Sequence, residues 1–168
     1  MTSWTAFEQA DPELGARARA LISSTTNCVL GTLMADGSPR LSGIDPFFFE
    51  DHLYLGSMPG ARKADDLRRD PRLALHGIPW ESRKVKADSP DPGDGDVKLT
   101  GRGVAVDDPA EVARVMGRYT ADRGIEEDMP AELFTIDLAT VVVVSVADDQ
   151  LVIDRWSATD GRKTVRRT

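Results

Sequence analysis

The chain of 168 residues has little cysteine and histidine: one cysteine, Cys28, and two histidines, His52 and His76. A single cysteine can form neither an internal disulfide nor a cysteine metal cluster. Cys28 stands beside valine and leucine in a strand-like run, which indicates a role in core packing. The sequence also lacks an HExxH motif, a Cys/His pair and a GxSxG motif. These absences argue against a zinc protease of the HExxH type and against a serine hydrolase of the GxSxG type.

Long apolar runs are missing as well. No run approaches the roughly 20 residues that span a bilayer, and residues 1–4 lack the basic and then apolar pattern of a signal peptide. We therefore expect a cytoplasmic protein without a membrane partner. The 21 basic residues are outnumbered by 28 acidic ones, which gives a formal net charge of −7. Nucleic-acid binding generally needs a positive field over a broad surface, so we predict no nucleic-acid partner, whereas small anions stay compatible with this charge.

The residues that are present have the composition of an ordinary globular domain, 40% apolar and 29% charged. We predict one domain, residues 1–168, that is mainly β with peripheral helices. Many short strands in succession favour a small barrel, and the first three are expected to form an antiparallel meander. Strands are predicted at 27–34, 39–44, 47–55, 73–76, 97–106, 133–138, 141–146 and 151–155, and helices from Asp11, at 62–69 and from Asp108.

Two segments lack these patterns. Residues 81–96 combine proline and glycine with Asp, Ser and Lys, so we expect a mobile loop there. Residues 157–168 are rich in basic residues, and we expect a flexible C-terminal tail.

Residues 53–72 carry a strand that runs directly into a helix. Leu53-Tyr54-Leu55 is strand-like, a Pro/Gly turn follows, and the helix at 62–69 is ended by Asp70-Pro71. Such a junction directs free backbone N–H groups and the positive end of the helix dipole beyond the strand. Arg62 and Lys63 add full charges there, which predicts a phosphate-binding site. The alternative is a basic helix face in solvent.

Three pieces of sequence, residues 31–42, 53–57 and 62–72, stand in an order and spacing that resembles a known group. Together they resemble the pyridoxamine 5′-phosphate oxidase-like, FMN-binding split β-barrel superfamily, in particular its flavin/deazaflavin-dependent oxidoreductase branch. The resemblance covers about residues 14–155. It implies a split β-barrel homodimer whose cofactor, FMN or the deazaflavin coenzyme F-420, lies between the subunits. Apolar residues at 47–49 and 141–146 also favour a homodimer, because a half-open barrel would leave them insufficiently covered in a monomer.

The resemblance also assigns site residues. Arg62 and Lys63 match the basic residues that bind the phosphate, and the strand from Arg40 to Ile44 matches the one that contacts the ring. Trp156 would reach over from the partner subunit. Trp80 and Trp156 can stack on a planar ring or fill an interface. The cofactor-binding residues implied in this way are Arg40, Ser42, Gly43, Ile44, Ser57, Met58, Arg62, Lys63 and Trp156; for Met58, packing is the favoured role.

The chain departs from the founding enzyme of that family after Trp156. It lacks the C-terminal Arg-Leu-x-Pro ending that goes with a pyridoxal-type substrate, so a true pyridoxamine phosphate oxidase is not expected. No acid/base pair emerges from the sequence, which suits an enzyme whose cofactor performs the chemistry. We therefore expect a flavin- or deazaflavin-dependent oxidoreductase that transfers a hydride to or from a small organic substrate, with no metal and no identified catalytic residue.

Two other functions fit the same sequence. The chain could be a non-catalytic binder or carrier of the cofactor, or a haem-binding relative with His52 or His76 as axial ligand. Between the two cofactors, basic residues beyond the phosphate site give a slight preference for the longer anionic tail of coenzyme F-420. These residues are Arg68, Arg69, Arg72, Arg155, Arg162, Lys163, Arg166 and Arg167.

Overall fold

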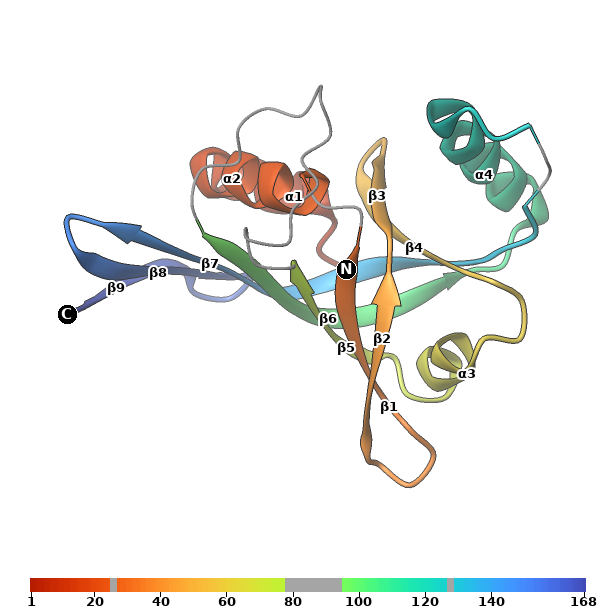
Figure 1. Ribbon diagram of the computed structural model, residues 1–168, viewed down its shortest axis with the longest axis horizontal. Helices are drawn as coiled ribbons and strands as arrows, with labels where there is room; N and C mark the ends of the chain where they lie inside the picture. Colours follow the sequence, from red (N-terminus) through yellow and green to blue (C-terminus); the bar gives the residue numbers. More distant parts are fainter. Residues whose placement is uncertain (25–26, 78–94, 127–128) are drawn as a thin grey trace.

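The computed structural model describes residues 1–24, 27–77, 95–126 and 129–168. The strands form a single antiparallel sheet, and the helices lie around it (Figure 1). This arrangement confirms the mainly β, split-barrel fold class. The helices are α1 (Trp4–Ala10), α2 (Pro12–Ser23), α3 (Arg62–Arg69) and α4 (Pro109–Arg123). The strands are β1 (Cys28–Leu33), β2 (Pro39–Ile44), β3 (Pro46–Phe49), β4 (His52–Ser57), β5 (Arg72–Gly77), β6 (Asp96–Val106), β7 (Glu132–Ala147), β8 (Gln150–Ser157) and β9 (Gly161–Arg167).

The order of strands in the sheet is β2-β1-β5-β6-β7-β4-β3, and the hairpin of β8 and β9 adds to β7. Strands β2 and β3 therefore lie at opposite ends of this path, so the predicted meander is wrong. The chain makes two separate hairpins, β1–β2 and β3–β4, because Pro46 lacks the N–H that a continuous ladder would need.

The long strand β7 organises the sheet. One of its edges pairs with β6 over 133–144, while the other edge pairs with β4 over 132–135 and with β8 over 140–147. Between these two stretches, the N–H of Leu138 donates to the carbonyl of Thr2 at 3.0 Å. The N–H of Thr2 donates to Asp137 Oδ1 at 2.6 Å. The first residues of the chain thus fill the gap between β4 and β8.

The sequence indicates two strands where β7 is continuous. The polar interruption near Thr140 is a β-bulge: Thr100 of β6 is opposite Thr140, but the next residue, Gly101, is opposite Leu138. A Cβ atom at Gly101 would lie 2.3 Å from the carbonyl oxygen of Asp137, so glycine permits the close approach. The bulge absorbs one residue without ending the strand.

The main core lies between the sheet and the first two helices, which cover one side of it in Figure 1. Helix α1 supplies Trp4 and Phe7, which are 1% and 0% exposed. This helix is absent from the sequence-based prediction. The start of α2 at Asp11 is confirmed, since the Asp11 side chain accepts from the N–H of Leu14. Cys28 is buried in this core, as predicted.

A second, smaller core lies under α4. Val115 and Met116 of α4 pack with three residues of the sheet, Phe47, Tyr54 and Leu133, and the predicted helix from Asp108 is confirmed. Valines 141 and 143 are fully buried in the main core of the same chain. The apolar segment at 141–146 is therefore covered in part within one chain, while Val146 is 65% exposed.

The C-terminal residues form strand β9, not a flexible tail. Their sequence shows no apolar alternation, because polar side chains hold the strand. Asp154 of β8, 2% exposed, accepts hydrogen bonds from Thr164 (2.6 Å) and Arg162 (3.2 Å) of β9 and from Arg17 of α2 (2.9 Å). Burial raises the pKa of the Asp154 carboxyl, but these donors lower it below its ordinary value.

The predicted loop at 81–96 and Trp80 lie outside the described residues, apart from the end of that segment, where Asp96 begins β6. None of the helices in the described ranges is long and apolar enough to cross a bilayer.

Candidate functional site

The predicted strand–turn–helix junction is present: α3 spans Arg62–Arg69, as predicted, and β4 ends at Ser57, beyond the predicted end of the strand at residue 55. Helix α3 has Ala61 at its N-cap and no side chain that caps it, whereas Ser3, Asp11 and Asp108 cap the other three helices. The first N–H groups of α3 are therefore left without a side-chain acceptor among the described residues. The positive end of its dipole is open to an anion.

The turn before α3 is held by Glu132 of β7. Gly60 has a φ of +74°, which favours glycine, and its N–H donates to Glu132 Oε1 at 2.9 Å. The N–H of Ala61 donates to the carbonyl of Met58 at 3.1 Å. Hydrogen bonds from Gly60 and from Arg68 lower the pKa of Glu132, so this carboxylate stays ionised and holds the turn.

The two predicted phosphate-binding side chains differ in their contacts. Lys63 donates from Nζ to the carbonyl of Gly43 at 2.8 Å, which joins the start of α3 to β2. Arg62 is exposed, and its side chain has no hydrogen bond or ion pair with the described residues. The structure therefore brings the helix start and the strand at Arg40–Ile44 together, as the sequence analysis expects.

Strand β2 presents its residues to two faces. Arg40 and Ser42 are half-buried and lie on the same face, while Gly43 on the other face is exposed. Ile44 is 4% exposed and belongs to the core, so its backbone is the part left for a ligand.

The end of β4 supplies the next two predicted residues. Ser57 is buried, and its hydroxyl donates to the carbonyl of Met58 at 3.4 Å. Met58 is 77% exposed, so a packing role for it within one subunit is excluded.

Sequence reasoning missed the residue that connects α3 to Arg40. The Asp66 carboxylate is 3% exposed and accepts from Thr32 Oγ1 at 2.9 Å, from Arg40 Nε at 2.6 Å and from Arg69 at 3.1 Å. Burial raises its pKa, but these three donors lower it below the ordinary value. Its position between Ala64 and Leu67, which form the buried face of α3, is the sequence signal that could have revealed it.

Trp156 and two arginines of α3 have partners within the chain. Trp156 is 4% exposed and packs in the core of its own chain, with its ring 4.7 Å from that of Phe7. Arg68 and Arg69 of α3, named above as basic residues beyond the phosphate site, are exposed. Arg68 pairs with Glu132 and Asp107, and Arg69 pairs with Asp66.

Neither histidine bonds to the residues named for this site, although His76 and Gly43 are both opposite Val29 of β1 in the sheet. His76 Nε2 lies 2.8 Å from Asp96 Oδ2, and the ring of His52 packs edge-on against Tyr54. In the ranges that the structure describes, no three residues among His, Cys, Asp and Glu come together as a metal site.

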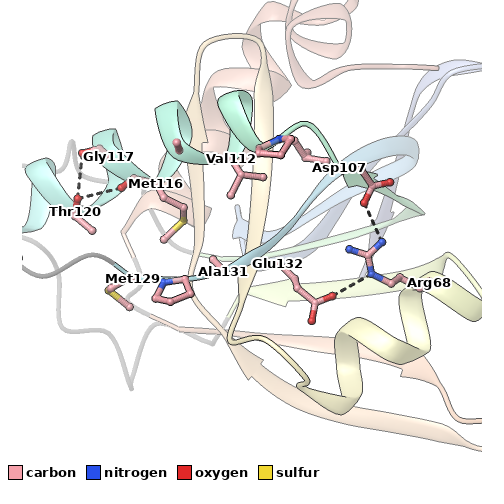
Figure 2. Close-up of a pocket in the computed structure, with 13 residues that line it drawn as sticks. Arg68, Asp107, Val112, Met116, Gly117, Thr120, Met129, Ala131 and Glu132 are labelled. Carbon is pink, nitrogen blue, oxygen red and sulfur yellow. Dashed lines mark hydrogen bonds and ion pairs between the residues drawn. The ribbon is translucent and has the colours of Figure 1, made fainter.

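A groove of about 530 Å³ lies between α4 and the sheet, beside α3 (Figure 2). Figure 2 shows Arg68 reaching between Glu132 and Asp107, with both hydrogen bonds at 3.0 Å. Because these charged groups satisfy one another, the groove offers an otherwise mainly apolar wall, to which Val112, Met116 and Met129 contribute. Its charged groups are thus paired with one another, whereas the side chain of Arg62 at the start of α3 has no hydrogen bond or ion pair with the described residues.

The sequence and fold match known proteins. A family model described as pyridoxamine 5′-phosphate oxidase matches residues 14–146. A candidate pyridoxamine 5′-phosphate oxidase from Listeria innocua has the same fold, with a TM-score of 0.58, 20% identity, and coverage of 78% of this chain and 98% of that one. Among the curated proteins, none matches this sequence.

Two further solved structures show how varied proteins of this fold are. PhzG from Burkholderia lata 383, in complex with tetrahydrophenazine-1-carboxylic acid, has a TM-score of 0.59 and 12% identity, with 95% of this chain and 90% of that one covered. A heme binding protein from Mycobacterium smegmatis has a TM-score of 0.54 and 17% identity, with 89% and 56% covered. At these identities the likeness shows the fold alone.

Proposed function

The chain belongs to the pyridoxamine 5′-phosphate oxidase family, and from this premise we propose that it is an oxidoreductase that binds a flavin or deazaflavin at the junction of α3 and β2. The observation that carries the proposal is the uncapped start of α3, where Arg62 has no partner among the described residues and Lys63 contacts β2 at Gly43. Three kinds of positive group are present at the start of α3: backbone N–H groups, the Arg62 guanidinium and the Lys63 ammonium. This set suits a phosphate.

Each part of the junction has a role in the proposal. Arg62 and Lys63 bind the phosphate, and the exposed backbone at Gly43 with the Ser42 side chain contacts the ring. Ser57 is the last residue of β4, before the turn that leads to Arg62. The bound cofactor, FMN or coenzyme F-420, would supply the hydride chemistry, and the protein would bind and orient it.

The case for coenzyme F-420 is weaker than the sequence suggests. The basic residues expected to contact its longer anionic tail are largely neutralised within the chain: Arg68, Arg69 and Arg72 all pair with carboxylates. On the C-terminal strand, Arg162 and Lys163 are also paired. We therefore take FMN as the first cofactor to test, with a small organic molecule other than pyridoxamine phosphate as substrate.

We also propose a homodimer, on a different surface from the one the sequence suggests. Leu41 on β2 and Met58 beside α3 are 75% and 77% exposed, and both flank the proposed cofactor site. Large apolar side chains in such positions favour coverage by another subunit. Light scattering at micromolar concentration should give twice the mass of the chain, and a monomeric mass would contradict this.

The purified protein tests the cofactor directly. Added FMN should bind with quenching of its fluorescence and saturate at one FMN per chain, and reduction of the bound flavin followed by reoxidation with a hydride acceptor would distinguish an enzyme from a carrier. Absence of quenching at about 100 μM FMN, far above a typical cofactor affinity, would contradict the proposal. The same titration with coenzyme F-420 ranks the two cofactors.

Haem binding is the second candidate, since proteins named for it share this fold. His76 is the residue to test, because its ring is half-exposed and Asp96 fixes its orientation. Added haem would give a shifted Soret band that disappears in His76→Ala. An unshifted band in the wild-type protein would eliminate this candidate.

A further inference from the structure

Asp66 carries a charge, and burying a charge is costly. The residue is only 3% exposed, so water compensates little of that cost. A buried carboxylate persists when hydrogen bonds replace its hydration. Thr32, Arg40 and Arg69 provide them from β1, from β2 and from α3 itself. The carboxylate thus joins three elements directly below the proposed phosphate site.

The arginines around the two buried aspartates are used differently. Arg69 also donates to the carbonyl of Leu33, and around Asp154 both Arg17 and Arg162 have a second acceptor, in Ser145 and Glu13. Arg40 is bonded to its aspartate through Nε, and its two terminal amino groups donate to no other described residue. Its side chain is 24% exposed, so part of it is accessible to a ligand.

The terminal amino groups of Arg40 belong to the same contact between α3 and β2 as the proposed phosphate site. Lys63 and Asp66 are one turn apart on α3 and lie on the same side of the helix. Lys63 contacts β2 at Gly43, and Asp66 contacts β2 at Arg40. Arg40 and Lys63 therefore border one strip between the helix and the strand.

We propose that Asp66 is a positioning residue: it holds Arg40 by Nε so that the two terminal amino groups of Arg40 receive the anionic group of the ligand together with Lys63. The inference rests on the proposed function, because it takes that anion to be the cofactor phosphate. A guanidinium fixed at Nε presents its outer N–H pair in the plane that suits two phosphate oxygens.

The charge of Asp66 and its positioning role predict effects of opposite sign. Asp66→Asn removes a negative charge near the site. The loss of its repulsion would by itself tighten the binding of an anion. Loss of the fixed geometry has the opposite effect, since a long side chain must then be ordered when the ligand binds. We expect the second effect to dominate.

The experiment compares FMN with riboflavin, which has the same ring and no phosphate, by fluorescence quenching. Arg40→Met should weaken FMN binding about tenfold, as expected for a charge-assisted hydrogen bond. Asp66→Asn should weaken it about fivefold, and the double variant should bind FMN within about twofold of Arg40→Met, because Asp66 acts through Arg40. Riboflavin affinity should stay within about twofold of wild type in all three variants.

Asp154→Asn is the matched control, because it changes the same residue type with the same kinds of donors, and it should leave FMN affinity unchanged. Tighter or unchanged FMN binding in Asp66→Asn would overturn the inference. Equal losses for FMN and riboflavin would also overturn it, since they would show a merely structural role. Wild-type protein that binds neither ligand would instead overturn the proposed function, and the inference with it.

Arg40→Lys provides a second route if Asp66→Asn does not fold. Lysine keeps the charge, but one ammonium cannot hold Asp66 and also present two amino groups to a ligand. FMN binding should weaken about fivefold or more, with riboflavin unaffected. Wild-type FMN affinity in Arg40→Lys would overturn the inference independently of Asp66.

Discussion

The two buried aspartates, Asp66 and Asp154, have closely similar surroundings and different consequences. Each is at most 3% exposed and accepts from one threonine and two arginines. Around Asp154, both arginines also bond elsewhere, so the cluster is complete within the protein. Around Asp66, the outer amino groups of Arg40 are left for something else. This difference is the reason why we assign Asp66, and not Asp154, to the proposed site.

The clusters also differ in what they connect. Asp154 joins α2, near the start of the chain, to the β8–β9 hairpin at its end, with Arg17 137 positions away from it in sequence. Asp66 joins neighbouring elements at the proposed site. The first cluster should therefore act mainly on global stability and the second mainly on ligand binding.

The largest expected effect is on the Asp154 side. Asp154→Ala should lower the free energy of unfolding by about 3 kcal/mol, at the low end for breaking a buried ion pair, because Arg17 and Arg162 can turn partly to water. Urea denaturation followed by circular dichroism measures it. A loss below about 1 kcal/mol, or weaker FMN binding by the folded variant, would remove the distinction between the clusters.

At the proposed cofactor site, Lys63→Ala should weaken FMN binding about tenfold, or roughly 1.4 kcal/mol, with little change in stability. Its Nζ contacts one exposed carbonyl, so the fold loses little without it. Arg118→Ala is the control, because it removes one positive charge from an exposed pair on α4. Equal losses in the two variants would indicate a general charge effect instead of a phosphate site.

Lowering the pH should reduce the contribution of both the Asp66 and the Asp154 cluster to the stability of the fold. Both carboxyl groups have a pKa lowered from 3.8, with burial opposing and the donors causing the shift. Such a group stabilises the fold above its unfolded pKa and loses this contribution as the pH falls through its folded pKa. The free energy of unfolding should therefore decline below about pH 4. Denaturation at pH 5, 4 and 3 should show a shallower decline for Asp154→Asn than for wild type; equal slopes would contradict the assignment.

The smallest effect is expected at Gly117, on α4 away from both clusters. A Cβ atom there meets nothing within 4 Å, so Gly117→Ala should raise the free energy of unfolding by up to about 1 kcal/mol. Gly117→Leu would also enter the groove of Figure 2, which Gly117 lines. Both variants should bind FMN like wild type. Loss of FMN binding in Gly117→Leu alone would move the cofactor into the groove.

Local signals in the sequence predicted the local parts of the structure. The bounds of α3 follow from a turn before it and Asp70-Pro71 after it, and the β1–β2 hairpin follows from its Asp-Gly turn. The contact between α3 and β2 was expected from the family resemblance, and Lys63 makes it.

Long-range partners could not be predicted in the same way. Asp66 looks like one of two adjacent charges on a helix until Thr32 and Arg40 are brought against it. Strand β9 has no apolar alternation, because its order comes from a contact with Asp154. Trp156 was placed at an interface by analogy, although α1, which carries no strong sequence signal, buries it.

The bond between Thr2 and Leu138 has a consequence for the order of folding. It joins residues 136 positions apart and fills the one stretch of that edge of β7 between β4 and β8. Closing so long a loop costs much chain entropy for few contacts, so it is favourable only after the sheet has formed. The first residues of the chain should therefore attach last, and the Leu138 amide should gain protection from hydrogen exchange later than its neighbours in β7.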